Sequence, residues 1–202
     1  MLQIFLELID RTVSLLEKKN QRAKTSVTNL VEPIYKELKT IHLDYMDFFN
    51  KALLKFEGSE SNARNILREV LSDLKMDRVR LQGIRDEVFV LSEKLKKANF
   101  EHEVIQFFVS VHEYFPTEKM DYGPPPKYSS AATGLIGDLV QLEYRRPLIR
   151  VQGKLVPGEH DPSVFREKSM VFIKMYIDIK TRQWKEVCEK YASVKVMEVN
   201  KL

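Results

Sequence analysis

LREVLSDLKMDRVRLQGIRDEVFVLSEKLKKA, residues 67–98, is the stretch of sequence that decides the fold. Apolar residues recur in it at alternating steps of three and four, and only Asp77 interrupts the series. The series consists of Leu67, Val70, Leu74, Leu81, Ile84, Val88, Leu91, Leu95 and Ala98. Such a repeat keeps one stripe of a helix facing a partner helix over many turns. The stretch therefore predicts a long helix that packs along its length against another helix.

A second stretch with the same spacing precedes the first. Its stripe comprises Val31, Ile34, Leu38, Ile41, Tyr45, Phe48 and Ala52. This helix would begin with Asn29 as a cap or with Pro33 as its first helical residue, and Gly58 would end it. We expect Gln21–Thr28, before it, to be a polar connection. Because the two stretches are separated only by four residues of turn type, the simplest arrangement is an antiparallel helical hairpin.

Shorter helical patterns flank the hairpin. Met1–Leu16 and Val104–Tyr114 both place apolar residues on one helical face, and Pro116 would end the second of these helices. Asp161 followed by Pro162 is a strong start signal for a long C-terminal helix. We predict that the first and last helices pack against the hairpin.

The clearest internal boundary is the proline-rich segment 117–128, which predicts a linker or crossover. It separates an N-terminal helical hairpin and bundle region, 1–116, from C-terminal helices, 129–202, that complete the bundle. Leu148–Val156 alternates weakly and fits a short β-hairpin. Val194–Val199 either pairs with that hairpin as a strand or continues the last helix. We therefore predict an all-α fold, an elongated antiparallel helical bundle with a long coiled-coil-like hairpin, and leave open a small β element near the C-terminal half.

Composition places the chain among ordinary globular proteins. Its 202 residues are 44% hydrophobic and 31% charged, with a net charge of +4. This balance excludes wholesale disorder and permits, without requiring, an acidic partner. No apolar run approaches membrane-spanning length, and the single cysteine, Cys188, excludes an internal disulfide. We expect a cytoplasmic protein that has no membrane partner.

Residues that carry out chemistry form no recognisable pattern. None of the four histidines has a glutamate three residues before it, the spacing that carboxylate-bridged metal bundles require. We expect these side chains to be solvated or to cap helices, and they are His42, His102, His112 and His160. No glycine-rich phosphate loop is present in the sequence. We therefore predict no catalytic residue, no metal ligand and no cofactor.

Two basic clusters contain no acidic residue and lie at predicted connections between helices. The first consists of Lys18, Lys19, Arg22 and Lys24, and the second of Arg145, Arg146, Arg150 and Lys154. Cations at such connections reach phosphates without local neutralisation. They support a nucleic-acid-binding accessory protein as an alternative function.

The preferred hypothesis is a non-enzymatic interaction or scaffold subunit that docks through the long hairpin. Three apolar residues of the second predicted helix of the hairpin lie off its apolar stripe: Ile66, Leu71 and Phe89. We assign them, together with Asp77, to partner binding. The partner is then another protein, with a second copy of the chain or a nucleic acid as alternatives. A helical enzyme whose site is assembled from scattered residues is a weaker alternative.

Overall fold

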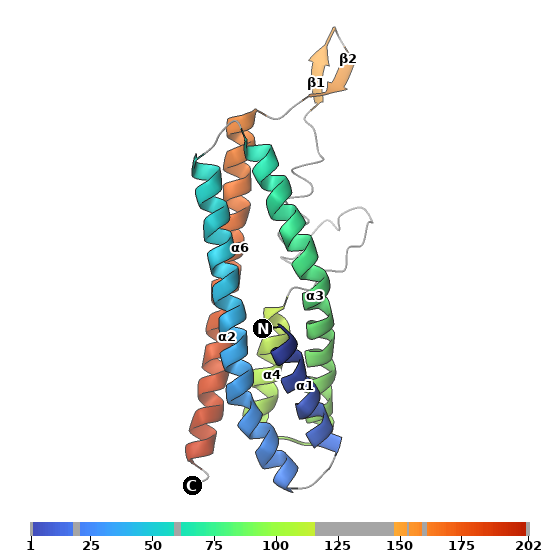
Figure 1. Cartoon of the computed structure of the whole chain (residues 1–202), viewed down its shortest axis with the longest axis vertical. Helices are drawn as coiled ribbons and strands as arrows, with labels where there is room; N and C mark the ends of the chain where they lie inside the picture. The colour runs from blue at the N-terminus through green and yellow to red at the C-terminus, as the bar shows by residue number, and fades with distance from the viewer. Residues whose placement is uncertain are drawn as a thin grey trace. The chain divides into compact units, whose positions relative to one another are not determined.

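The computed structural model describes residues 2–17, 21–58, 62–115, 148–152, 154–158 and 161–200, and its fold is all-α (Figure 1). The predicted linker, 117–128, lies outside the described residues. The elements in chain order are α1 (Leu2–Glu17), α2 (Gln21–Gly58), α3 (Ala63–Lys97), α4 (His102–Tyr114), β1 (Leu148–Val151), β2 (Lys154–Pro157) and α6 (Pro162–Val199). The predicted helical class is confirmed.

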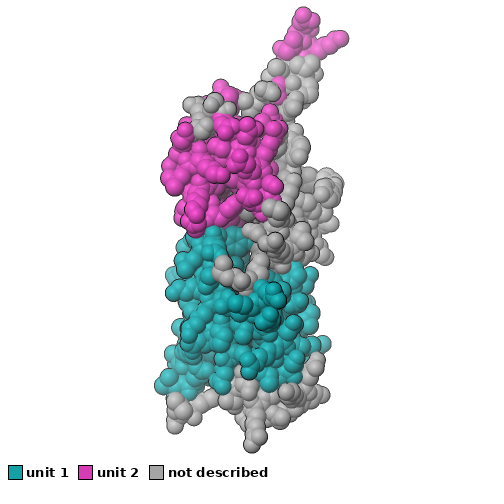
Figure 2. Space-filling view, in the orientation of Figure 1, with its two compact units in different colours: residues 1–46, 80–116, 179–202 teal, residues 47–79, 117–178 magenta. Residues whose placement is uncertain are grey.

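Contacts divide the chain into two compact units (Figure 2). Unit 1 comprises residues 1–46, 80–116 and 179–202, and unit 2 comprises residues 47–79 and 117–178. The three long helices α2, α3 and α6 contribute residues to both units.

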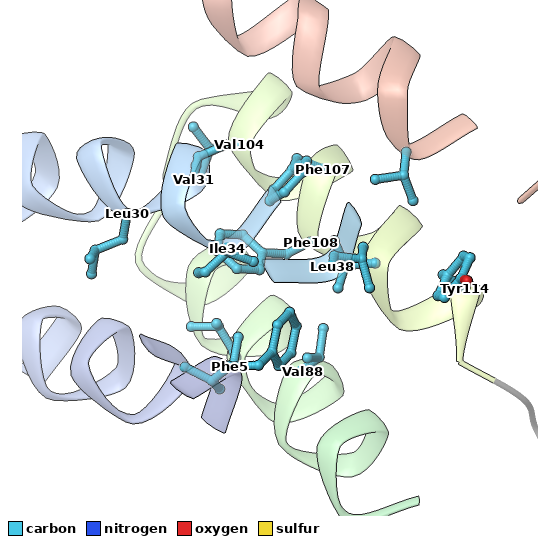
Figure 3. Close-up of a cluster of buried hydrophobic side chains, with 14 of the residues drawn as sticks. Phe5, Leu30, Val31, Ile34, Leu38, Val88, Val104, Phe107, Phe108 and Tyr114 are labelled. Carbon is cyan, nitrogen blue, oxygen red and sulfur yellow. The ribbon is translucent and has the colours of Figure 1, made fainter. Parts of the chain in front are cut away.

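The core of unit 1 is built around the short helix α4. The apolar face predicted for Val104–Tyr114 is buried in α4, and it consists of Val104, Phe107, Phe108, Val111 and Tyr114. Figure 3 shows Phe107 and Phe108 beside Val31, Ile34 and Leu38 of α2, with Phe5 of α1 and Val88 of α3 in the same cluster. Burying each such side chain contributes roughly 1.5–3 kcal/mol. The predicted stripes of α2 and α3 therefore face a shared interior.

Within unit 1, α2 and α6 run antiparallel. Glu32 contacts Lys195, Tyr35 contacts Tyr191, and His42 contacts Trp184. As the residue number rises along α2, the number of its partner on α6 falls, which only antiparallel helices produce. In this unit, α2 thus contacts the last helix of the chain through an ion pair and stacked aromatic rings.

Unit 2 has a smaller core in which α2, α3 and α6 participate. The buried apolar residues are Phe49, Ala52 and Phe56 of α2, Ala63, Ile66, Leu67, Val70 and Leu71 of α3, and Phe165 and Ile173 of α6. Phe49 packs edge-on against Tyr176, with ring centroids 5.2 Å apart. Lys55 Nζ lies 3.1 Å from Glu69 Oε2, so the end of α2 and the start of α3 lie together in this unit.

The C-terminus of α3 is closed by its own backbone. Asn99 adopts a left-handed conformation, with φ of 52°. Its N–H donates to the carbonyl of Lys96 at 3.1 Å, and the N–H of Phe100 donates to the carbonyl of Leu95 at 3.2 Å. These two bonds form a Schellman motif, and the buried Leu95 and Phe100 supply the apolar contact that accompanies it. Ala98, predicted to lie in the apolar stripe, is exposed because the helix has already ended.

The predicted start of α2 is wrong. The helix begins at Gln21, so Gln21–Thr28 is helical and Pro33 lies inside the helix. An interior proline costs about 3 kcal/mol. Leu30, Val31 and Ile34 surround it and are all buried, and their burial outweighs that cost.

The C-terminal predictions divide between two outcomes. The short β-hairpin is confirmed, because β1 and β2 pair antiparallel with Ile149 opposite Val156. Val194–Val199 does not join it as a strand, because α6 continues to Val199. Val194 is buried and extends the inward spacing of Val187 and Tyr191, which explains why the helix persists.

Candidate functional site

Four aromatic rings form a continuous stack between α2 and α6 in unit 1. Tyr191 stacks on Tyr35 at 3.9 Å between ring centroids, and Tyr35 stacks on Trp184 at 5.4 Å. His42 covers the other side of Trp184 at 4.7 Å. Each helix supplies two rings that are seven residues apart, so both pairs lie on one helical face and alternate. Stacked aromatic pairs each contribute about 0.5–1.5 kcal/mol beyond their burial.

Tyr114, the last residue of α4, contacts both this stack and Lys180 of α6. Its hydroxyl lies 3.1 Å from Nδ1 of His42, and its ring packs edge-on against Trp184. Lys180 Nζ donates to the carbonyl of Tyr114 and lies 4.5 Å from the centroid of the Tyr114 ring. Gln183 Nε2 donates to the carbonyl of Glu113 at 2.9 Å. Two side chains of α6 therefore cap the C-terminal carbonyls of α4.

Burial shapes the electrostatics of this group. Lys180 is 2% exposed, and desolvation lowers the pKa of its amine from 10.5 to about 7. Burial also lowers the pKa of His42, and the nearby charge of Lys180 adds to that effect. Desolvation raises the pKa of Tyr35 to about 12, with a further contribution from its contact with Cys188. The group is thus largely uncharged around its rings and holds one amine that titrates near neutral pH.

We name these six residues the aromatic–lysine cluster: Tyr35, His42, Tyr114, Lys180, Trp184 and Tyr191. An amine with a pKa near neutrality is chemically suited to act as a base or nucleophile. Here the amine is buried and donates to a main-chain carbonyl. The role that this geometry supports is structural, since the cluster fastens α4 between α2 and α6.

The sequence analysis missed this cluster. Lys180 belongs to an inward series on α6 with steps of seven, four, three, four and three: Ile173, Lys180, Trp184, Val187, Tyr191 and Val194. A lysine at an apolar position of this series is the sequence signal that would have identified the cluster. The expectation that the histidines are solvated or cap helices is wrong for His42, which is buried within the stack.

The predicted basic clusters are described only in part. Lys18, Lys19, Arg145 and Arg146 lie outside the described residues, and Arg22 and Lys24 lie in α2 without described side chains. Arg150 and Lys154 are both exposed on the β-hairpin. The structure therefore presents one part of the second cluster as an accessible surface.

The residues predicted to bind a partner do not form one exposed surface. Ile66 and Leu71 are each 5% exposed and belong to the core of unit 2. Phe89 is 49% exposed, and its ring lies 5.3 Å from that of His112. The side chain of Asp77 lies outside the described residues. Among these positions, Phe89 is the apolar side chain that a partner can reach.

A different exposed series lies on α6 in unit 2, and we name it the α6 outer seam. It consists of Val164, Lys168, Val171, Met175 and Asp178, which alternate steps of four and three. All five residues are exposed, and the apolar members keep 41%, 56% and 44% of their surfaces accessible. Residues at this spacing share one helical face. The seam has the periodicity of a coiled-coil contact.

Other classes of site are not found in the part of the chain that the structure describes. There, no group of three or more histidine, cysteine or acidic side chains is arranged to hold a metal ion. None of the helices within the described ranges is both long and apolar enough to span a membrane. The chain matches no family model, and no curated protein or solved structure is significantly similar to it.

Proposed function

We propose that the protein is a non-enzymatic interaction subunit of a larger assembly, and that the α6 outer seam is the surface on which a partner docks. The observation that carries the proposal is the exposure of three apolar side chains, Val164, Val171 and Met175, at coiled-coil spacing. Exposed apolar residues that are scattered singly need no explanation, whereas several that share one helical face favour a binding surface.

The two long stripes of the hairpin are less suited to this role. Their described members are mostly buried within the chain, for example Ile34 and Leu38 on α2 and Val88 and Leu91 on α3. A partner cannot use these side chains without unfolding the core. The docking surface proposed from the sequence therefore moves from the hairpin to α6.

The chemistry of the seam indicates a helical partner. Alternating steps of four and three keep a stripe aligned with a second helix over several turns. Lys168 and Asp178 interrupt the apolar series with opposite charges. Polar residues at seam positions fix register and partner choice at a cost in affinity. We therefore expect an amphipathic helix that presents an apolar stripe and complementary charges.

A pair of matched variants tests this proposal. Val171→Gln with Met175→Gln removes two apolar members of the seam, while Lys185→Gln with Glu189→Gln changes two exposed residues of the same helix in unit 1. Both double variants preserve net charge. In quantitative co-purification of the full chain from its native host, we expect the seam variant to lose the retained protein and the control to keep it. A chain that stays monomeric at micromolar concentration and retains no partner contradicts the proposal, as does equal loss in both variants.

A second candidate function is that of a nucleic-acid-binding accessory protein. It is supported by the exposure of Arg150 and Lys154 on the β-hairpin. Steep salt dependence of binding to DNA or RNA is its signature, because each phosphate contact releases counterions.

A further inference from the structure

The β1–β2 hairpin has an unusual distribution of charge. Residues 144–158, which include the hairpin, contain four cations and no acid. Those cations are Arg145, Arg146, Arg150 and Lys154. A segment this basic attracts a polyanion, and the acids that flank it in the sequence, Glu143 and Glu159, lie outside it.

The strand register places the two described cations on opposite faces of the hairpin. Arg150 lies opposite Leu155, and Lys154 lies opposite Val151. Because side chains alternate between the faces of a strand, each cross-strand pair occupies one face and adjacent pairs occupy opposite faces. Each face of this two-stranded ribbon therefore carries one exposed cation.

The shape of the ribbon limits the surfaces that engage both cations at once. A flat surface, such as a bilayer or the face of a protein sheet, contacts one side of a ribbon. A groove contacts both sides. The major groove of B-form DNA is about 12 Å wide, admits a two-stranded ribbon and is bordered by a phosphate backbone on each side. The major groove of A-form RNA is too narrow for side chains to enter.

We propose that the β1–β2 ribbon enters the major groove of duplex DNA, with Arg150 and Lys154 contacting the phosphates on opposite sides of the groove. This inference rests on the second candidate function and specifies its ligand and its surface. Phosphate contacts dominate the affinity, so we expect weak sequence preference.

The test measures binding of the full chain to a labelled 20-base-pair duplex DNA by fluorescence anisotropy at several salt concentrations. Arg150→Gln with Lys154→Gln is expected to weaken binding about tenfold per cation at about 0.1 M salt and to reduce the salt slope by about two. Lys174→Gln with Lys185→Gln removes the same charge from exposed positions on α6 and serves as the control. We expect this control to bind nearly as the wild type does.

Single variants test the two-sided geometry. Arg150→Gln and Lys154→Gln are each expected to reduce the salt slope by about one. A slope that changes in only one of them overturns the groove geometry. Tighter binding to double-stranded RNA or to vesicles rich in phosphatidylserine than to duplex DNA overturns the ligand.

The outcomes separate this inference from the function on which it rests. If the wild type binds DNA and both ribbon variants bind equally well, the nucleic-acid function stands and the ribbon proposal is wrong. If the wild type binds no duplex DNA at low salt, the ribbon proposal is wrong, and the nucleic-acid function is wrong as well if the chain also binds no RNA. Retention of a protein partner by the α6 outer seam is a separate measurement that neither result changes.

Discussion

Replacing Lys180 by methionine is expected to change the sign of its effect on stability between neutral and alkaline pH. Burial lowers the pKa of this lysine from 10.5 to about 7. Between these values the unfolded chain binds a proton that the native protein does not, so the lysine makes stability rise with pH. Each pKa unit corresponds to about 1.36 kcal/mol, so the cost at pH 7 is on the order of 4 kcal/mol.

Methionine fills a similar volume without a charge, but it leaves the carbonyl of Tyr114 without the donor that Lys180 supplies. Such a loss costs about 1–3 kcal/mol. At pH 7 the relief of desolvation is the larger effect, and we expect Lys180→Met to be more stable than the wild type by about 2 kcal/mol. At pH 10.5 the native amine is neutral and half of the unfolded chains carry the proton, so little of the desolvation cost remains, and the variant is expected to be less stable by about 1–2 kcal/mol.

Urea denaturation followed by circular dichroism at several pH values between 7 and 10.5 measures this difference. Comparing variant and wild type at each pH cancels the titration of other groups. Lys185→Met, at an exposed position of α6, is the control for the loss of a lysine side chain. Parallel stability curves for Lys180→Met and the wild type would refute the reasoning, because they would mean that Lys180 keeps an ordinary pKa.

Substitutions at three further positions test other parts of the fold, each by the free energy of unfolding in urea. Tyr114→Phe removes the hydroxyl that pairs with His42 Nδ1 in a buried setting, and we expect a loss of about 1–3 kcal/mol; an unchanged value would show that the hydrogen bond is not formed. Asn99→Val is expected to cost about 1–2 kcal/mol, because a β-branched residue resists positive φ. Asn99→Gly should be tolerated, because glycine adopts positive φ readily. Equal losses in the two variants would contradict the Schellman motif at the end of α3. Pro33→Ala restores a backbone donor inside α2 and is expected to add about 1–3 kcal/mol, while a loss would mean that the helix does not continue through this position.

Most of the fold could be predicted from the long three-four repeats of apolar residues in the sequence. Val88, Leu91 and Leu95 lie inside as predicted, because a three-four repeat can be satisfied only by a continuous neighbouring surface. The start of α2 could not be predicted in the same way. A proline at position 33 is a strong local signal for a helix start, and only the burial of residues on both sides of it shows that tertiary packing prevails.

The candidate site was less accessible to sequence reasoning for a different reason. The aromatic–lysine cluster joins α2, α4 and α6, whose residues lie far apart in the chain. Spacing within one helix places Tyr35 and His42 on a common face, but it does not identify Trp184 as the ring between them. Periodicity alone also does not distinguish the inward series of α6 that contains Lys180 from the α6 outer seam. Both series repeat mainly at steps of three and four.

Site-specific photo-crosslinking in the native host tests the central claim most directly. A photoreactive residue placed at Val171 lies in the α6 outer seam in unit 2, and one placed at Lys185 lies at an exposed position of the same helix in unit 1. The proposal predicts that the probe at 171 cross-links to one partner protein, at sites that repeat every three or four residues along a helix, and that the probe at 185 gives far less product. Equal cross-linking at both positions, or none at 171 in a chain that remains monomeric, would contradict the proposal that this protein docks through α6.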